Sequence, residues 1–303
     1  MLMKKILVIY YTQSGQLKEI AERIAKPFLD DENFQVDYHA IQMQQEFPFP
    51  WTSDVFFNTF PETFKQVPQP LKPVDPHILS TDYDLILLHY QVWYLTPSIP
   101  INSFLKSPEA KLILKGKPIV TINGSRNMWA YAQEKVKVLL RENEALLVGN
   151  IALTDRNHNL ISVITIVDWL FSGIKRRVYG FFPLPGVAQE EIISADKYGK
   201  IIMSYAKNGI FTGLQEELVK NGAVEFKFFL VSMDQKGNRM FRIWSDLILA
   251  NPKKRKLLIQ LFKYYIICAI YILSPIVNVI ELILFPLLWF VKIKKQKKYF
   301  QGI

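Results

Sequence analysis

The chain has 303 residues, half of them hydrophobic, and a formal net charge of +10. This size allows one large domain or two small ones with a substantial core. The single cysteine, Cys268, excludes an intramolecular disulfide framework and favours a reducing, cytoplasmic compartment. The strand-like run that begins at Lys4 follows the first residues directly, so no signal peptide is expected.

Nearly all of the excess positive charge lies in residues 251–303. This stretch holds ten Lys or Arg and one acid, Glu281, whereas the residues before it hold 27 basic and 26 acidic side chains. The charges bracket apolar sequence, which fits anionic lipid better than a phosphate backbone. We therefore expect a membrane surface as a partner and no nucleic acid.

Strand and helix patterns alternate over the first 208 residues. The apolar run KKILVIYY at 4–11 is typical of a buried parallel strand, and apolar residues at helical spacing follow over 17–29. The remaining elements follow from the same periodicities: strands at 35–41, 83–89, 118–123 and 145–153, and helices at 53–65, 129–140 and 188–207. The alternation predicts an α/β fold with a doubly wound, parallel five-stranded sheet.

Three segments exceed a minimal domain of this kind. An insert at about 157–185 is apolar and ends in Lys175, Arg176 and Arg177. It is consistent equally with a packed helix and with a lid or membrane-facing surface. Residues 209–250 are predicted to be a helical extension, and residues 251–303 a basic–apolar–basic tail that associates with a membrane.

The loop between the first strand and the first helix has the chemistry of a phosphate site. Thr12 and Ser14 supply hydroxyls, Gly15 permits an unusual backbone conformation, and Gln13 and Gln16 complete the loop. The N-terminus of the following helix adds its dipole and free N–H groups. The run VIYYTQSGQLKEIAERIA resembles the flavodoxin signature, whose loop T/S-x-T/S-G-x-T binds the phosphate of FMN. Leu17 stands where that family usually has a final Thr.

A second loop carries the resemblance further. The stretch from Tyr83 to Leu105, YDLILLHYQVWYLTPSIPINSFL, resembles flavodoxin-like reductases, which have an aspartate-led strand, an aromatic loop, a proline pair and a helix. In those proteins the aromatic loop lines the isoalloxazine ring. The resemblance implies that role for four residues here, Val92, Trp93, Tyr94 and Thr96.

A third loop follows the strand at 118–123. Asn123, Gly124 and Ser125 can supply amide donors to the pyrimidine edge of a flavin, and Arg126 can stabilise the negative charge of reduced flavin. The alternative is an ordinary Asn-Gly turn that precedes a core tryptophan, Trp129. Three such loops at the carboxyl ends of successive strands favour FMN as the cofactor.

The motifs VIYYTQSGQL, VWYLTPSIP and TINGSRNMW, with the basic–apolar–basic tail, resemble a more specific bacterial family. Its members are labelled dialkylresorcinol-condensing enzymes of pathways for flexirubin-type pigments, and are also described as the aromatase of the pathway. The resemblance implies a hydrophobic small-molecule substrate. It leaves open a homodimer and, as partners, a pathway ketosynthase or an acyl carrier protein.

The sequence favours the aromatase description over the condensing one. Claisen-type condensing enzymes need a cysteine thiolate, and Cys268 lies among apolar residues that keep a thiol unreactive. Turning a cyclohexanedione into a resorcinol removes two electrons and two protons, which suits FMN. A membrane-associated NAD(P)H:quinone reductase is the alternative, and a flavodoxin-type electron carrier is the third function considered.

The catalytic base is not identified by the sequence. His89 and Tyr90 are candidates because they follow the third strand near the expected ring, and Arg126 is a further candidate. A histidine at the end of a buried strand is alternatively a hydrogen-bonded core residue. The other histidines have no spacing typical of a metal site, so no metal is expected.

The apolar run of the tail, from Ile266 to Val291, is interrupted by Ser274, Asn278 and Glu281. As one helix it would be about 39 Å long, enough to span a bilayer. A single span would place basic clusters on both sides, and Pro275 and Pro286 are expected to break the helix. A re-entrant hairpin or an in-plane segment at the inner membrane is therefore favoured, with a buried core or oligomer helix as the alternative.

Overall fold

The computed structural model describes residues 3–288 and 293–303, and of residues 286–288 only the backbone. The end of the apolar run at 289–292, including Lys292 of the second basic cluster, lies outside the described residues, as do Met1 and Leu2.

Five parallel strands form the central sheet in the order β2-β1-β3-β6-β7. Their bounds are β1 Lys4–Tyr10, β2 Phe34–Ala40, β3 Leu85–Tyr90, β6 Pro118–Ser125 and β7 Leu146–Thr154. Numbered among themselves, the strands have the order 2-1-3-4-5, which is that of doubly wound flavodoxin-like sheets. The predicted fold class is confirmed.

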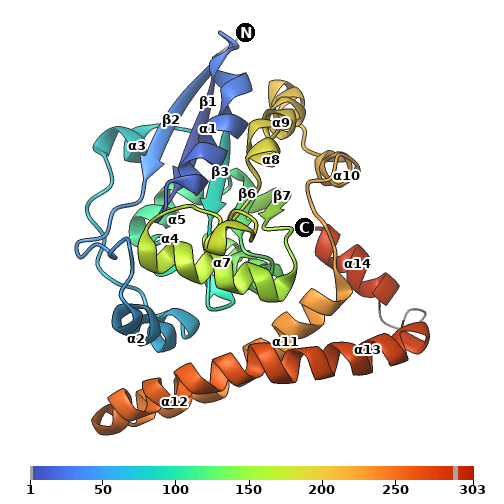
Figure 1. Ribbon diagram of the computed structural model, residues 1–303. Coiled ribbons are helices and arrows are strands. Elements are labelled where there is room, and N and C mark those ends of the chain that lie inside the picture. Colours follow the sequence, from blue (N-terminus) through green and yellow to red (C-terminus); the bar gives the residue numbers. More distant parts are fainter. Residues whose placement is uncertain (1–2, 289–292) are drawn as a thin grey trace.

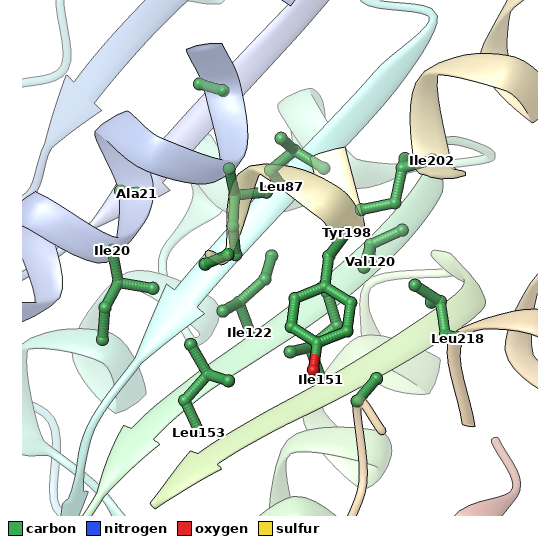
Figure 2. Packing of buried hydrophobic residues seen from close by; sticks show 14 of the residues in the cluster. Ile20, Ala21, Leu87, Val120, Ile122, Ile151, Leu153, Tyr198, Ile202 and Leu218 are labelled. Carbon is green, nitrogen blue, oxygen red and sulfur yellow. The ribbon is translucent and has the colours of Figure 1, made fainter. Parts of the chain in front are cut away.

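Helices cover both faces of the sheet (Figure 1). On one face lie α1 Gln16–Leu29, α8 Gln189–Ile193, α9 Asp196–Asn208 and α10 Leu214–Lys220. Figure 2 shows this core, where Ile20 of α1 and Tyr198 of α9 pack over β3, β6 and β7. On the other face lie α3 Pro76–Ser80, α4 Ile99–Leu105, α5 Pro108–Leu114 and α6 Ala130–Glu142. With both faces covered, all six residues of β3 are buried, as a continuous apolar run requires.

The helix expected over 188–207 is two helices, α8 and α9, which meet at Ser194 and Ala195. The break redirects the chain so that α9 packs closely on α1. At Gly199 of α9 a Cβ atom would lie 2.1 Å from the carbonyl oxygen of Ile24, so only glycine fits there. The short helices α3 and α5 were not expected, because five or seven residues are too few to show a helical period.

A further set of elements lies beyond the carboxyl ends of the strands (Figure 1). The two-residue strands β4 Val92–Trp93 and β5 Thr96–Pro97 form a hairpin directly after β3. Around it are α2 Ser53–Phe64, α7 Asn159–Ser172, the 3₁₀ turn η1 Val178–Gly180 and the long helix α11 Phe228–Ala250. The predicted insert contains α7, and the predicted extension contains α10 and α11.

The tail begins with the turn η2 Pro252–Lys254 and continues as one rod: α12 Arg255–Cys268, the π-helical segment η3 Ala269–Leu273 and α13 Ser274–Leu288 (Figure 1). The prediction that Pro275 and Pro286 break the helix is wrong. The re-entrant hairpin that depended on this break is wrong as well. Pro275 is the second residue of α13, and the wider turns of η3 directly before it accommodate a residue without an N–H group.

The rod packs on the body at both ends, and the chain then returns to the body. The Phe262 ring of α12 stacks on that of Phe60 in α2, with 3.9 Å between ring centroids. Glu281 of α13 is paired with Lys236 of α11. After the undescribed residues, α14 Lys294–Gln301 buries Phe300 against α6 and α11. The described residues of the tail therefore pack against the body along part of their surface.

Candidate functional site

A cavity lies at the carboxyl ends of β1, β3 and β6 and encloses about 1060 Å³, part of which is open solvent. Three loops predicted from the sequence meet there, the position at which doubly wound sheets bind ligands. Eleven of the fourteen predicted cofactor residues line it: Thr12, Gln13, Ser14, Gln16, Leu17, Val92, Trp93, Tyr94, Gly124, Ser125 and Arg126.

The first loop presents unused donors at the start of α1. Gly15 has a left-handed backbone with φ 88°, and its N–H group donates to the Thr12 hydroxyl over 3.1 Å. Within the described residues, the N–H groups of Gln16, Leu17 and Lys18 have no acceptor. An anion could therefore accept several backbone N–H groups at the positive end of the helix dipole. Gly15 itself shapes the loop without lining the cavity.

Leu17 fills the place of the usual threonine with an apolar side chain. It is 4 % exposed and packs against the third loop, where a Cβ atom on Gly124 would lie 2.8 Å from Leu17 Cδ1. The first and third loops therefore touch through Leu17 and Gly124. The side-chain contact to phosphate that the threonine would make is absent, and backbone donors remain.

The aromatic loop is the tip of the β4–β5 hairpin. Tyr94 and Leu95 both have left-handed backbones, φ 49° and 61°, an arrangement that costs non-glycine residues about 1–3 kcal/mol each. Contacts hold the tip in place: the Tyr94 hydroxyl donates to the Phe56 carbonyl over 2.5 Å, and Leu95 packs against Gly237 of α11. Trp93 meets the rings of Tyr11, Phe47 and Trp51 edge-on.

The third loop brings a cation to the cavity. Arg126 Nη1 donates to the carbonyl and side-chain oxygens of Asn159 at 3.2 and 2.8 Å, and Nη2 lies 3.7 Å from Met128 Sδ. No carboxylate of the described residues forms an ion pair with it. Burial among surrounding atoms lowers the pKa of Arg126 to about 10, although Asp155 and Tyr271 act against this shift. The Ser125 hydroxyl beside it has no hydrogen-bond partner.

Two predicted cofactor residues, Thr96 and Asn123, lie outside the cavity lining. Thr96 is fully buried, and its hydroxyl donates to the Thr63 carbonyl. Asn123 is also fully buried, and neither of its side-chain amide atoms has a partner.

The candidate bases His89 and Tyr90 are both fully buried and do not line the cavity. The His89 ring contacts the Leu87 carbonyl, and burial lowers its pKa to about 4. Tyr90 donates to Gln133 Oε1 over 2.6 Å, and burial raises its pKa. The hypothesis that either takes a proton from a substrate is therefore corrected, because neither reaches the space where a substrate would bind. His89 is a core histidine.

Further residues, most of them distant in sequence from the three loops, build the walls that the sequence did not identify: Ile20, Trp51, Phe56, Gln91, Ile166, Trp169, Leu170 and Gly186. Helix α7 supplies three of them, so the insert covers the site as a lid would. The apolar insert and the aromatic segment before α2 were the only signals of these walls in the sequence. Neither signal predicts which other element the segment will pack against.

Buried Asp155, directly after β7, holds these walls together. Its carboxylate accepts from the Ser162 hydroxyl of α7 at 2.7 Å and from the Gly186 N–H group at 3.3 Å. Gln16 then exchanges two hydrogen bonds with the Val187 backbone, at 3.0 and 3.1 Å. The lid and the phosphate loop are thus joined directly.

The donor set fits FMN. Free N–H groups suit its phosphate, aromatic and aliphatic walls suit its ring, and the described lining contains no carboxylate to repel either. No group of three His, Cys, Asp or Glu that could hold a metal occurs in the described part of the chain.

The sheet order and the position of the cavity define a flavodoxin-like α/β fold. No family profile and no curated protein matches the chain. Similar solved structures include a flavoprotein in complex with FMN from Lactobacillus acidophilus NCFM, with 19 % identity, 48 % of this chain and 91 % of that chain covered, and a TM-score of 0.36. An oxidised flavodoxin from Bacillus cereus is also similar, with 15 % identity and a TM-score of 0.37. That match covers 67 % of this chain and 99 % of the flavodoxin.

Proposed function

We propose that this chain is an FMN-dependent oxidoreductase that works at a membrane surface on a hydrophobic ring substrate. The observation that carries the proposal is the single cavity shared by the phosphate loop, the aromatic hairpin and the Arg126 loop. When bound, FMN would supply two-electron oxidation or reduction of the substrate. The Thr12–Leu17 loop would hold its phosphate, and Val92, Trp93 and Tyr94 would lie beside its ring.

The reaction we favour is aromatisation of a cyclohexanedione-type precursor to a dialkylresorcinol. The cavity walls beyond the loops are aliphatic and aromatic. Trp51 and Phe56 supply one part of them, and Ile166, Trp169 and Leu170 of α7 supply another. They suit a ring with alkyl substituents and give the lid a role in excluding water. An electron carrier has no need of such walls.

An NAD(P)H:quinone reductase remains the second candidate, since a quinone is also an apolar ring. The two functions differ in the electron donor. Mixing the oxidised protein with a cyclohexanedione and, separately, with NADPH under anaerobic conditions distinguishes them. Bleaching of the flavin absorbance by the dione supports the aromatase, and bleaching by NADPH alone supports the reductase.

The arrangement of the tail supports an in-plane position at the membrane. The three polar residues of its apolar run face the body: Ser274 and Glu281 are buried, and Asn278 is partly buried. Exposed apolar side chains run along the other side from Leu257 to Leu284. The stretch 252–285 is long and apolar enough to span a membrane, yet α11 holds it along the body. Exposed lysines flank it at 253, 254 and 256 and at 294–298.

FMN binding is tested with the purified full-length chain and a matched pair of glycine variants. Gly15 and Gly116 both have left-handed backbones with open space where a Cβ atom would lie, φ 88° and 71°. Both Gly→Ala changes add similar backbone strain, about 1 kcal/mol. We expect G15A to weaken FMN binding at least tenfold and G116A to bind as the parent does. A parent protein that takes up no FMN contradicts the proposal.

A further inference from the structure

Arg126 is a partly buried cation whose partners within the described structure are all neutral. Of its five N–H donors, the contacts to Asn159 and Met128 use at most three. The carboxylate of Asp155, which acts on Arg126 electrostatically, already accepts from Ser162, Gly186 and Asn157. A charge withdrawn from much of the solvent without an ionic partner is costly, so its place in the cavity lining points to an anion that arrives with a ligand.

The phosphate of FMN has donors of its own. The phosphate loop follows β1, whereas Arg126 follows β6, and β3 lies between them in the sheet. Two strand spacings separate the ends of β1 and β6 by about 10 Å, and the loops that follow them touch through Leu17 and Gly124. The first loop also has its own unused donors, at the start of α1.

Arg126 lies within electrostatic range of the tail. The hydroxyl of Tyr271, in the π-helical segment of the rod, is close enough to interact electrostatically with the guanidinium. Tyr271 is 39 % exposed and belongs to the apolar stretch that we place at the membrane. A ligand arriving from the lipid side would thus find Arg126 close to the tail, with apolar cavity walls available for its alkyl groups.

The described lining of the cavity contains no general base. Among its described lining residues there is no Asp, Glu, His or Lys, and the Tyr94 hydroxyl is bound to the Phe56 carbonyl. Removing a proton from a ring dione would then have no acceptor on the protein. The difficulty disappears if the ligand binds already ionised, with its proton released to water.

We infer that Arg126 binds the ionised ring oxygen of an enolic or phenolic ligand and so selects the oxyanion. This inference rests on the proposed function, because it names the substrate class of the same site. The guanidinium offers paired donors to the oxygen and lowers the pKa of the bound ligand. A β-dione would be held as its enolate, which needs no base before its oxidation, and a resorcinol product as its phenolate.

The test uses the flavin-loaded full-length chain and an alkylated nitrophenol, whose phenolate absorbs visible light. We expect the bound probe to ionise at least one pH unit below the free probe, which corresponds to about tenfold tighter binding of the phenolate than of the phenol. R126Q should lose this preference, and R126K, which keeps the charge without the fork, should keep part of it. R176Q is the matched control, because Arg176 is paired with Asp168 and lies outside the cavity.

Three results would overturn the inference. One is an unchanged pKa of the bound probe in the parent protein. Another is equal binding of the methyl ether of the probe by the parent, a measurement that needs no variant to fold. The third is a change of flavin reduction potential in R126Q with phenolate binding intact, which would assign Arg126 to the cofactor. Absence of bound flavin contradicts the proposed function instead, and the probe titration still tests Arg126.

Discussion

At the scale of single residues, Gly186 joins the lid to the phosphate loop. Its backbone is left-handed, with φ 83°, and an added Cβ atom would lie 2.5 Å from Gln16 Oε1 and 3.0 Å from Trp169 Cζ3. We predict that G186A displaces Gln16 from the Val187 backbone and weakens FMN binding at least tenfold, together with a loss of about 1–3 kcal/mol in stability. Flavin fluorescence titration and thermal unfolding measure the two effects.

Gly180 provides the control, since it has a similar φ of 77° but nothing within 4 Å of an added Cβ atom. G180A should be destabilised only by the added backbone strain, and its affinity for FMN should stay that of the parent. Equal affinities in the two variants would mean that the contact between Gln16 and Val187 has no part in holding the cofactor.

Local chemistry made one part of the site predictable and left the rest hidden. The loop Thr12–Leu17 was found because strand, turn and helix are contiguous, and the turn residues have special backbone needs. Gly186 and Trp169 follow it by more than 150 residues, and nothing local in the sequence marks a glycine that will approach Gln16. His89 and Tyr90 misled because position along the chain does not tell which way a strand residue points.

At the scale of elements, Asp234 fastens α11 to the start of α6. Its carboxylate accepts from the Tyr131 N–H group at 3.0 Å and from Asn238 at 2.9 Å, and the residue is fully buried. Burial raises the pKa of Asp234 to about 7 from 3.8. Between these values the unfolded chain releases this proton before the folded chain does, so the free energy of unfolding falls as the pH rises.

We predict that D234N, which stays neutral, gains stability relative to the parent as the pH rises from 5 to 8. Lys135 faces Asp234, and burial lowers its pKa to about 8, so it is charged in both states over most of this range. The control is D168N. The pKa of Asp168 is lowered by Arg176, so its contribution to stability is lost only as the pH falls below about 4. A flat difference for D234N, measured by urea unfolding, would show that Asp234 titrates normally.

Helices and strands were predictable where a residue pattern repeats. The prediction failed where packing against a neighbouring element determines the structure. The five strands followed from apolar runs, whereas the continuous rod of α12, η3 and α13 contradicts the helix-breaking rule at Pro275. The rule concerns an isolated helix. Here α11 and α2 hold the rod through Glu281 and Phe262, and a π-helical segment accommodates the proline.

At the scale of the whole molecule, one side of the rod has nothing packed on it within the described structure. Ile272 and Ile283 are 57 % and 72 % exposed, and similar side chains continue the row at 261, 264, 276 and 279. A row of this length exceeds what soluble monomers usually expose and calls for lipid or a second copy of the chain. The lysines at both ends favour anionic lipid, because the lysines of two copies would repel one another across a dimer interface.

We predict that the full-length protein floats with vesicles that contain phosphatidylglycerol and that I272E/I283E loses this binding at least tenfold. Fully burying one such side chain contributes about 1.5–3 kcal/mol, so two charged replacements should remove most of the affinity. High salt shortens the Debye length and should weaken the parent's binding without abolishing it, because apolar burial does not depend on screening. The control is L112E, which alters an exposed leucine of α5 and should float like the parent. L112E and I272E/I283E should both bind FMN with the same affinity. If the parent stays in solution with vesicles and I272E/I283E halves its mass by light scattering, the row is a dimer interface, and the membrane proposal is contradicted.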